Sequence, residues 1–190
     1  MAHPASPRPV HLFCGVLVRD MEIFVKARAL LERRYGAVDF VSPAVPFTFT
    51  DYYEREMGKD LLRVLLSFET LVDPGRLVEI KLETNRIEAE LTAMREGRLC
   101  RTINLDPGYL DSSKVVLATA KTLAHRVYLG QGIYAEVTLT FGHDHCRFFD
   151  WTYADYRSPE VSGVLLDMRR RYLSALKTRR AASGLSGTSS

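Results

Sequence analysis

Three polar segments hold the side chains whose types could do chemistry: residues 104–109, 125–141 and 151–157. Asp106 and Glu136 are carboxylates, and carboxylate oxygens are preferred ligands of hard divalent cations. Phosphoryl groups need such cations, or Arg and Lys side chains, around their negative charge. We therefore predict Asp106, Glu136 and His125 as catalytic residues. Mg²⁺ or Mn²⁺ is the cofactor that this chemistry would use, although the sequence assigns no metal ligands.

Further polar and aromatic side chains near these segments, and in residues 51–58, could contact a ligand. The predicted ligand-binding residues are Asp51, Tyr53, Glu54, Asn104, Tyr109, Lys114, Arg126, Tyr134, Thr138, Trp151, Asp155 and Arg157. A plainer interpretation stays open for each. Arg126 and Glu136 could form a cross-strand ion pair at an exposed site, worth under about 1 kcal/mol, Asp106 could stabilise a turn, and the tyrosines could cover the edge of a core.

Known catalytic motifs are absent from the sequence. It holds no Gly-x-x-x-x-Gly-Lys-Ser/Thr loop, no dinucleotide fingerprint and no Gly-x-Ser-x-Gly elbow. His143-x-His145-Cys146 has donor types that zinc accepts, but no second cluster supplies the remaining ligand. We interpret residues 142–145 as a polar hairpin turn.

The segment 125–141 is predicted to be a β-hairpin whose loop is Gly130-Gln131-Gly132. That loop pairs Leu129 with Ile133, Tyr128 with Tyr134, Val127 with Ala135, Arg126 with Glu136 and His125 with Val137. Because side chains alternate along a strand, one face would hold Arg126, Tyr128, Tyr134, Glu136, Thr138 and Thr140. The core face would hold Val127, Ala135, Val137, Leu139 and Phe141, and His125 would point away from Glu136.

The elements before this hairpin follow from hydrophobic patterning. Strands are predicted over 10–19, over 38–49 as an edge strand broken by two prolines, over 61–72 and over 99–105, where the last ends in an Asp106-Pro107-Gly108 turn. Asp20 caps one helix that stops at Gly36, and a second helix runs from Asp73-Pro74-Gly75 towards Gly97. Residues 114–122 are a fifth strand or a short helix.

This order predicts an α+β fold with a ferredoxin-like βαββαβ core, a C-terminal β-meander and a terminal helix. Two helices would cover one face of an antiparallel sheet, so the other face must be covered or bind something. The terminal helix is capped by Ser158 with Pro159 at its first position, and Val161, Val164, Leu165, Met168, Tyr172 and Leu176 form its buried stripe. We expect a disordered tail over 1–9, a single domain over 10–182 and a second tail over 183–190.

Composition excludes several classes. A chain of 190 residues with 46% hydrophobic residues suits one globular domain, and no apolar run approaches the roughly 20 residues of a membrane-spanning helix. The early prolines do not suit a secretory signal, and three scattered cysteines do not suit a disulfide framework. We expect a cytoplasmic protein without a membrane partner, and read Cys14 and Cys100 as core residues.

Two functions fit these features. The leading hypothesis is a binding site for a phosphate-bearing or nucleotide-like small molecule, with divalent-metal-assisted phosphoryl chemistry as its catalytic form. The alternative is a non-catalytic RNA-binding or assembly module, which would use the tyrosines and the basic residues of the terminal helix. A net charge of +3 is too small to announce a nucleic-acid binder by itself. The sequence decides neither the reaction nor the oligomeric state.

Four strings resemble a known family: residues 47–58, 104–110, 125–139 and 151–157. The family consists of uncharacterised bacterial and archaeal proteins of about this length, classed as a domain of unknown function and often labelled "GTP-binding protein". The resemblance runs from Val10 to about Leu176. It implies a single cytoplasmic domain whose motif residues include Asp51, Glu54, Asn104, Asp106, His125, Arg126 and Glu136. It implies no particular reaction, and the chain carries no nucleotide-binding motif that would support the label.

Overall fold

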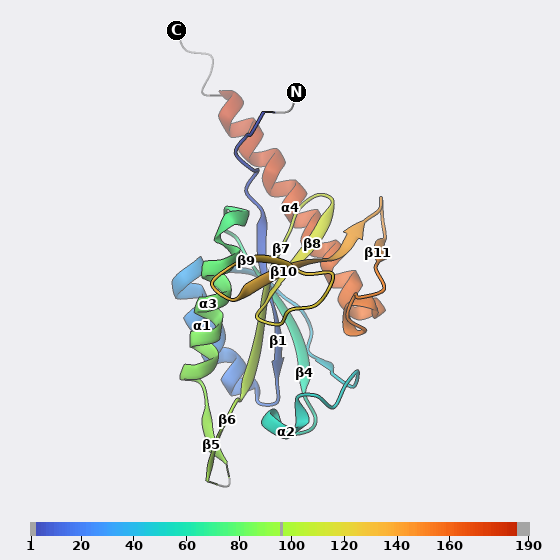
Figure 1. Ribbon diagram of the computed structural model, residues 1–190. Coiled ribbons are helices and arrows are strands. Elements are labelled where there is room, and N and C mark those ends of the chain that lie inside the picture. Colours follow the sequence, from blue (N-terminus) through green and yellow to red (C-terminus); the bar gives the residue numbers. More distant parts are fainter. Residues whose placement is uncertain (1–2, 96, 186–190) are drawn as a thin grey trace.

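The computed structural model describes residues 3–95 and 97–185, which form a mixed α/β fold around a large antiparallel sheet (Figure 1). The helices are α1 (Met21–Tyr35), α2 (Glu54–Met57), α3 (Leu77–Glu90) and α4 (Pro159–Leu185), with 3₁₀ turns η1 (Pro74–Arg76) and η2 (Asp155–Arg157). The strands are β1 (His11–Val18), β2 (Val38–Val41), β3 (Val45–Pro46), β4 (Leu62–Phe68), β5 (Ala93–Arg95), β6 (Arg98–Cys100), β7 (Ile103–Leu110), β8 (Lys114–Thr119), β9 (Val127–Gly130), β10 (Ile133–Phe141) and β11 (Cys146–Phe148).

The main sheet has the strand order β11-β10-β8-β7-β1-β4-β2, with β3 also paired to β4 and β9 to β10. Helices α1 and α3 lie on one face, and every second side chain of β1, such as Leu12, Val16 and Val18, packs in the core on that face, while the whole strand is buried. As predicted, Asp20 caps α1 by accepting a hydrogen bond from the Glu22 amide, and Gly36 follows its end with φ of 91°. This side holds the larger core.

Helix α4 covers part of the opposite face. Its buried residues Val161, Leu165, Met168 and Tyr172 pack on side chains of β1, β4, β8 and β10, including Phe13. The predicted start of this helix is confirmed, because α4 begins at Pro159 and the Ser158 hydroxyl accepts a hydrogen bond from the Val161 amide. The helix extends to Leu185, so residues 183–185 of the predicted tail are helical, whereas residues 186–190 lie outside the described residues.

A β-bulge in β10 changes which side chains face α4. Val137 pairs with Val116 and Leu139 pairs with Val115, so Thr138 is an extra residue in β10. Ala135 and Val137 therefore pack on the α3 side, while Leu139 packs on the α4 side and Glu136 faces the cavity on that same side. The prediction that Ala135, Val137, Leu139 and Phe141 share one core face is wrong, because a bulge reverses the alternation and leaves no mark in hydrophobic patterning.

The hairpin loop is also shorter than predicted. Tyr128 pairs with Tyr134 and Val127 with Ala135, as expected, but Gly130 rather than Leu129 pairs with Ile133. The loop thus consists of Gln131 and Gly132, which have φ of 53° and 76°. Two positive φ values are what a two-residue loop needs to match the twist of its strands.

Two further boundaries differ from the prediction. Helix α3 ends at Glu90, and Met94 lies in β5 of a two-stranded hairpin with β6. Asp106, Pro107 and Gly108 do not form a turn: they lie inside β7, opposite Gly15, Cys14 and Phe13 of β1. Pro107 is tolerated there because β8 pairs with β7 only from Gly108 onwards, which leaves the proline at an open edge.

The remaining predicted elements are present. Residues 114–119 form the strand β8 rather than a helix, and the proline-broken segment forms the short edge strands β2 and β3. Cys14 is buried in the core, whereas Cys100 is only half-buried in β6. No helix among the described residues is long and apolar enough to cross a membrane.

Candidate ligand-binding pocket

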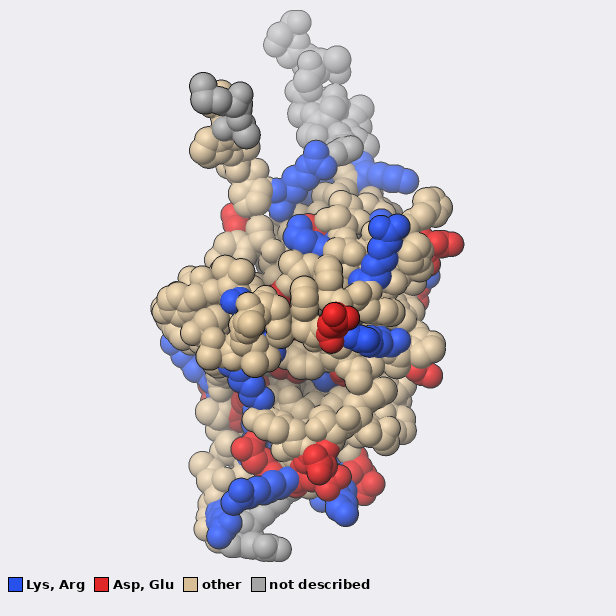
Figure 2. All heavy atoms as spheres, turned by 45° about the vertical axis from the view of Figure 1, so that its right-hand side comes forward, with Lys and Arg blue, Asp and Glu red and all other residues tan. Residues whose placement is uncertain are grey.

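A cavity of about 550 Å³ lies on the part of the sheet face that α4 leaves uncovered. Its floor is formed by side chains of β4, β7 and β10, and its walls by residues 47–56, residues 117–121 and residues 153–156. Figure 2 shows the molecule hollowed at mid-height on this side, with basic side chains gathered at the end where the C-terminal part of α4 runs. Pockets of 300–1,000 Å³ are typical of small-molecule sites.

Arg63 lies at the centre of the floor. Its side chain is 5% exposed, and Nη2 lies 2.7 Å from the Asp155 carboxylate while Nη1 lies 3.6 Å from Asp106 Oδ2. Burial by itself would lower the pKa of this guanidinium, but Asp155, Tyr156 and Asp106 outweigh burial and raise it. Arg63 is therefore a permanent cation held between two carboxylates.

Several buried polar atoms of this floor have no hydrogen-bond partner among the described residues. They include Arg63 Nε, Arg63 Nη1 and the Tyr156 hydroxyl. Leaving a buried donor unsatisfied costs about 1–3 kcal/mol. Gly15 makes the assembly possible, because a Cβ at this position would lie 2.8 Å from the Tyr156 hydroxyl and 3.1 Å from Arg63 Nη1.

The sheet is open beside the floor, where β7 and β8 diverge before Gly108. The Leu105 peptide groups that face this opening are satisfied by α3: the Leu105 amide donates to Glu88 Oε1 at 2.6 Å, and Lys81 Nζ donates to the Leu105 carbonyl at 2.8 Å. Burial raises the pKa of Glu88, although the Lys81 charge opposes that shift. Lys81 and Glu88 also line the cavity, which thus reaches through the sheet.

Aromatic side chains dominate the outer walls. Phe47, Phe49, Tyr52 and Tyr53 come from the segment that precedes α2, and Tyr153 comes from the segment before η2. Two cations cover aromatic rings at this level: Arg101 lies 5.6 Å from the centre of the Tyr53 ring, and Lys121 Nζ lies 3.9 Å from the centre of the Tyr52 ring. Arg101 also pairs with Glu56 and Glu88.

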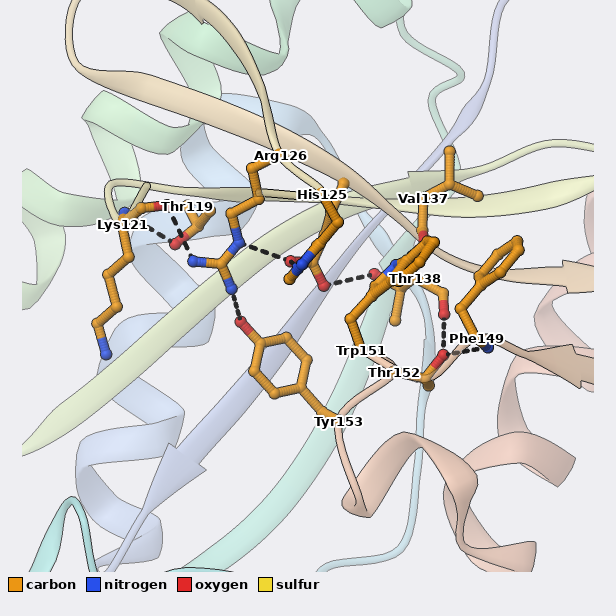
Figure 3. Close-up of polar contacts among 11 residues, drawn as sticks. Thr119, Lys121, His125, Arg126, Val137, Thr138, Phe149, Trp151, Thr152 and Tyr153 are labelled. Atoms are coloured by element: carbon orange, nitrogen blue, oxygen red, sulfur yellow. Dashed lines mark hydrogen bonds and ion pairs between the residues drawn. The ribbon is translucent and has the colours of Figure 1, made fainter. Parts of the chain in front are cut away.

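Glu136 lies at the inner wall and is contacted by an arginine and a histidine. Arg126 Nε donates to Glu136 Oε2 at 2.7 Å, and His125 Nε2 lies 3.1 Å from the same oxygen (Figure 3). Arg126 also donates to the Lys121 carbonyl and to the Tyr153 hydroxyl. Burial raises the pKa of Tyr153 to about 12, with a further contribution from the Glu136 carboxylate, so this phenol keeps its proton and can donate it.

The prediction that His125 points away from Glu136 is wrong. His125 precedes β9, which begins at Val127, so strand alternation does not apply to it. Its ring stacks on Trp151 with centroids 5.1 Å apart, and Trp151 stacks in turn on Phe149 at 4.8 Å. The Trp151 indole N–H donates to the Val137 carbonyl. These contacts fix His125 behind the pocket wall, and Figure 3 shows this residue together with Arg126, Trp151 and Phe149.

The structure brings some predicted site residues together and separates others. Tyr53, Asn104, Asp106, Glu136 and Asp155 line the cavity. A second set does not line the cavity but contacts Glu136 or shapes the loop before η2: His125, Arg126, Thr138, Trp151 and Arg157. The residues that lie outside it are Asp51, Glu54, Tyr109, Lys114 and Tyr134.

Arg157 and Lys114 have structural contacts. Arg157 donates to the carbonyls of Thr152, Phe149 and Asp150, and so shapes the loop that carries Trp151. Lys114 pairs with Asp111 at 2.6 Å and lines, together with Tyr109, a second cavity of about 580 Å³ beside α4. Neither side chain reaches the main pocket.

Arg63 and Tyr156 are the central residues that the sequence interpretation missed. One signal existed for Arg63: it is the single charge inside the apolar run 61–68, where a buried cation requires partners. Tyr156 gave no comparable signal, because a tyrosine in the same segment as Trp151 and Tyr153 is expected to lie at the surface. Lys81 and Glu88 on α3, and Arg101 in the connection between β6 and β7, were also missed, because they lie outside the three polar segments.

The carboxylates do not form a preorganised metal site. Among the residues with described placement, no group of three or more His, Cys, Asp or Glu side chains could hold a metal ion. Asp106 Oδ2 accepts a hydrogen bond from Asn104 at 2.7 Å, and Glu136 is engaged by Arg126 and His125. His143 and His145 lie in the exposed turn between β10 and β11, as the sequence indicated.

The family model described as "Domain of unknown function (DUF4416)" matches residues 8–172. The match includes every residue that lines the main pocket, and it confirms the predicted resemblance to an uncharacterised domain family. Neither the curated proteins nor the solved structures contain a match to the chain.

Proposed function

We propose that this chain, which belongs to the DUF4416 family, binds a phosphate-bearing or nucleotide-like small molecule in the main pocket. One observation carries the proposal: unpartnered, buried donors of Arg63 and Tyr156 lie on the floor of a cavity of about 550 Å³. Buried polar groups are normally satisfied. A ligand that accepts hydrogen bonds would satisfy these and recover the cost of burying them.

The wall chemistry supports a ligand with a planar ring. Phe47, Tyr53 and Tyr153 offer aromatic faces, on which a heterocyclic base can stack. Lys121 stands at the rim, where its ammonium group lies over the Tyr52 ring, 3.9 Å from the ring centre. A phosphate outside the aromatic walls would meet this charge.

Binding is better supported than metal-assisted phosphoryl transfer. A cation that entered the pocket would find Glu136 already paired with Arg126 and His125, and Asp106 and Asp155 already beside Arg63. Mg²⁺ and Mn²⁺ are usually held by more than one carboxylate or by the phosphates of the ligand itself. We therefore propose that any divalent cation enters together with the phosphate.

The RNA-binding alternative has less support from the basic helix. Arg169 donates to the carbonyls of Ser112, Gly142 and His143 and lies over the Phe141 ring, so it holds α4 on the sheet. Arg171 lies over the Phe40 ring, 4.9 Å from its centre, and contacts the Asp39 carbonyl. Arginines whose guanidinium groups already contact their own chain contribute little to a phosphate-binding surface.

We also propose that residues 11–110 form a ferredoxin-like unit. The order β7-β1-β4-β2, with α1 and α3 on one face, supports this assignment. Strands β8 to β11 then extend the sheet on the β7 side, and the pocket forms where this extension begins to diverge.

A blocking substitution tests the proposed function. Ala120 lines the pocket mouth and is exposed, so Ala120→Trp should fill the cavity without disturbing the core. Isothermal titration with nucleoside monophosphates, with and without Mg²⁺, should show binding by the wild type and a loss of about tenfold or more in the variant. Ala44→Trp places the same ring on an exposed loop outside the pocket and should leave affinity unchanged.

Two outcomes would contradict the proposal. Wild-type protein that binds none of these nucleotides would exclude a nucleotide-like ligand. Equal affinity of wild type and Ala120→Trp would show that binding occurs elsewhere. Thermal unfolding of both tryptophan variants without ligand would establish that each remains folded.

A further inference from the structure

The charges on the pocket floor suggest which end of a ligand enters first. Arg63 carries one positive charge, whereas Asp106 and Asp155 carry two negative charges beside it. The group is thus net negative before any ligand arrives. A phosphate placed here would meet both carboxylates in a poorly solvated space, where repulsion between charges is strong. The deep end suits an uncharged group.

The same floor offers a donor and an acceptor side by side. Arg63 Nη1 has no hydrogen-bond partner and lies 3.6 Å from Asp106 Oδ2. Asp106 is 28% exposed in its side chain, so it faces the cavity, and an ionised carboxylate can only accept hydrogen bonds. The Tyr156 hydroxyl, also unpartnered, adds a second donor near Arg63, because both approach Gly15.

A ligand edge that matches this pair has an acceptor next to a donor. A lactam has this arrangement, with a ring carbonyl beside a ring N–H, and it is neutral. Its carbonyl would accept from Arg63 or Tyr156, and its N–H would donate to Asp106. An amino-imine edge has the reverse arrangement: its bare ring nitrogen would face the Asp106 carboxylate, and its amino group would face the donors of Arg63.

We infer that the pocket selects nucleotide-like ligands with a lactam ring, bound with the ring edge on Arg63 and Asp106 and the phosphate outward at Lys121. This inference rests on the proposed function and adds the ring chemistry and the orientation. The orientation agrees with the charge distribution, because Lys121 lies at the rim on the Tyr52 ring rather than among the floor carboxylates.

Two matched nucleotide pairs test the inference by isothermal titration. Inosine and adenosine monophosphates differ only at the relevant edge, and uridine and cytidine monophosphates differ in the same way. The wild type should bind each lactam nucleotide about tenfold or more tightly than its amino-imine counterpart, since a two-bond base-edge contact discriminates by about that factor. Lys121→Gln should weaken all four nucleotides by a similar factor and leave the preference intact.

Asp106→Asn is the decisive variant. An amide can donate as well as accept, so the preference within each pair should fall to about threefold or less. Asp144→Asn makes the same change in an exposed turn outside the pocket and should retain the wild-type preference. If Asp106→Asn does not fold, as judged by circular dichroism, the wild-type preference and the effect of Lys121→Gln decide the inference.

The outcomes separate the two claims. Equal binding within both pairs, with a loss in Ala120→Trp, would overturn the lactam inference and leave the pocket proposal in place. An amino-imine preference would do the same. Binding of no nucleotide would overturn both. A lactam preference that persists in a folded Asp106→Asn protein would exclude Asp106 as its source.

Discussion

At the scale of single residues, the pocket depends on buried charges, which need partners, and on buried phenols, whose pKa is raised. Arg63 and Asp155 are both about 5% exposed, and neither could be buried alone without a large cost in free energy. Burial raises the pKa of the Tyr53 and Tyr153 phenols, and the Asp106 carboxylate raises both further. The pocket therefore presents neutral phenols in its walls and a fixed cation on its floor across the physiological pH range.

An alkaline titration should reveal these protected phenols. Burial raises the pKa of six of the nine tyrosines, and the Tyr153 pKa reaches about 12. The six are Tyr35, Tyr53, Tyr109, Tyr153, Tyr156 and Tyr172. In a titration followed by absorbance at the phenolate band, most of them should ionise above about pH 10, the ordinary tyrosine value. Protein in denaturant should instead titrate in one step near that value.

The same shifts set the direction of the stability change. A phenol with a higher pKa in the folded state binds its proton more tightly there than in the unfolded chain. Its contribution to stability is thus complete below about pH 10 and declines as pH rises further. Urea unfolding should show a falling free energy of unfolding above this pH. Ionisation of all nine tyrosines near pH 10 in folded protein would contradict the assignment.

At the scale of elements, Arg126 connects three parts of the pocket wall. It contacts Glu136 in β10, the Lys121 carbonyl in the β8–β9 loop, and Tyr153 before η2. Arg126 and Glu136 are 3% and 1% exposed in their side chains, so this ion pair is buried. The sequence interpretation of a cross-strand ion pair was correct in its partners, but an exposed site was the wrong setting.

Removing one member of this pair should be costly. Arg126→Gln should lower the free energy of unfolding by about 3 kcal/mol, because it leaves the buried Glu136 carboxylate without its main cation. Arg126→Gln/Glu136→Gln should be more stable than the single variant. Arg76→Gln breaks the exposed pair with Glu79 and should cost less than about 1 kcal/mol. Equal losses in Arg126→Gln and Arg76→Gln, measured by urea unfolding, would refute the buried-pair argument.

Element boundaries show what patterning can and cannot predict. Strand β1, helix α1 and the start of α4 followed from an apolar run, an Asp cap and a Ser-Pro start, which are local signals. The bulge at Thr138 and the course of β7 through Pro107 depend on neighbouring strands, and local patterning cannot detect them. Asp106, predicted to lie in a turn, lies inside β7 and lines the pocket.

At the scale of the whole molecule, the sheet face opposite α1 and α3 is divided between a helix and a pocket. The sequence predicted that this face needs a cover or a ligand, and the structure shows α4 on one part and the cavity on the other. The site itself could be predicted only in part. Arg63 comes from β4, far in sequence from Asp106 and Asp155, and only the strand order brings them together.

The packing of α4 on the sheet should depend on the side chains of this helix that face the sheet. Leu165 is fully buried against the sheet, whereas its neighbour Leu166 is half-buried. Leu165→Ala should lower the free energy of unfolding by about 2–5 kcal/mol, and Leu166→Ala should cost clearly less. Thermal or urea unfolding measures both. A smaller loss at Leu165 than at Leu166 would mean that α4 does not pack on the sheet as described.

The bulge in β10 has a consequence for chain length. Glu136 and Leu139 point to the same side although three positions separate them, because Thr138 adds an odd step. A relative lacking one residue at this point would regain simple alternation and still present both side chains to that side. A deletion of one residue at Ala135 would instead move each preceding side chain of the strand to the opposite face of the sheet. Natural length variation in this strand should therefore concentrate at the bulge.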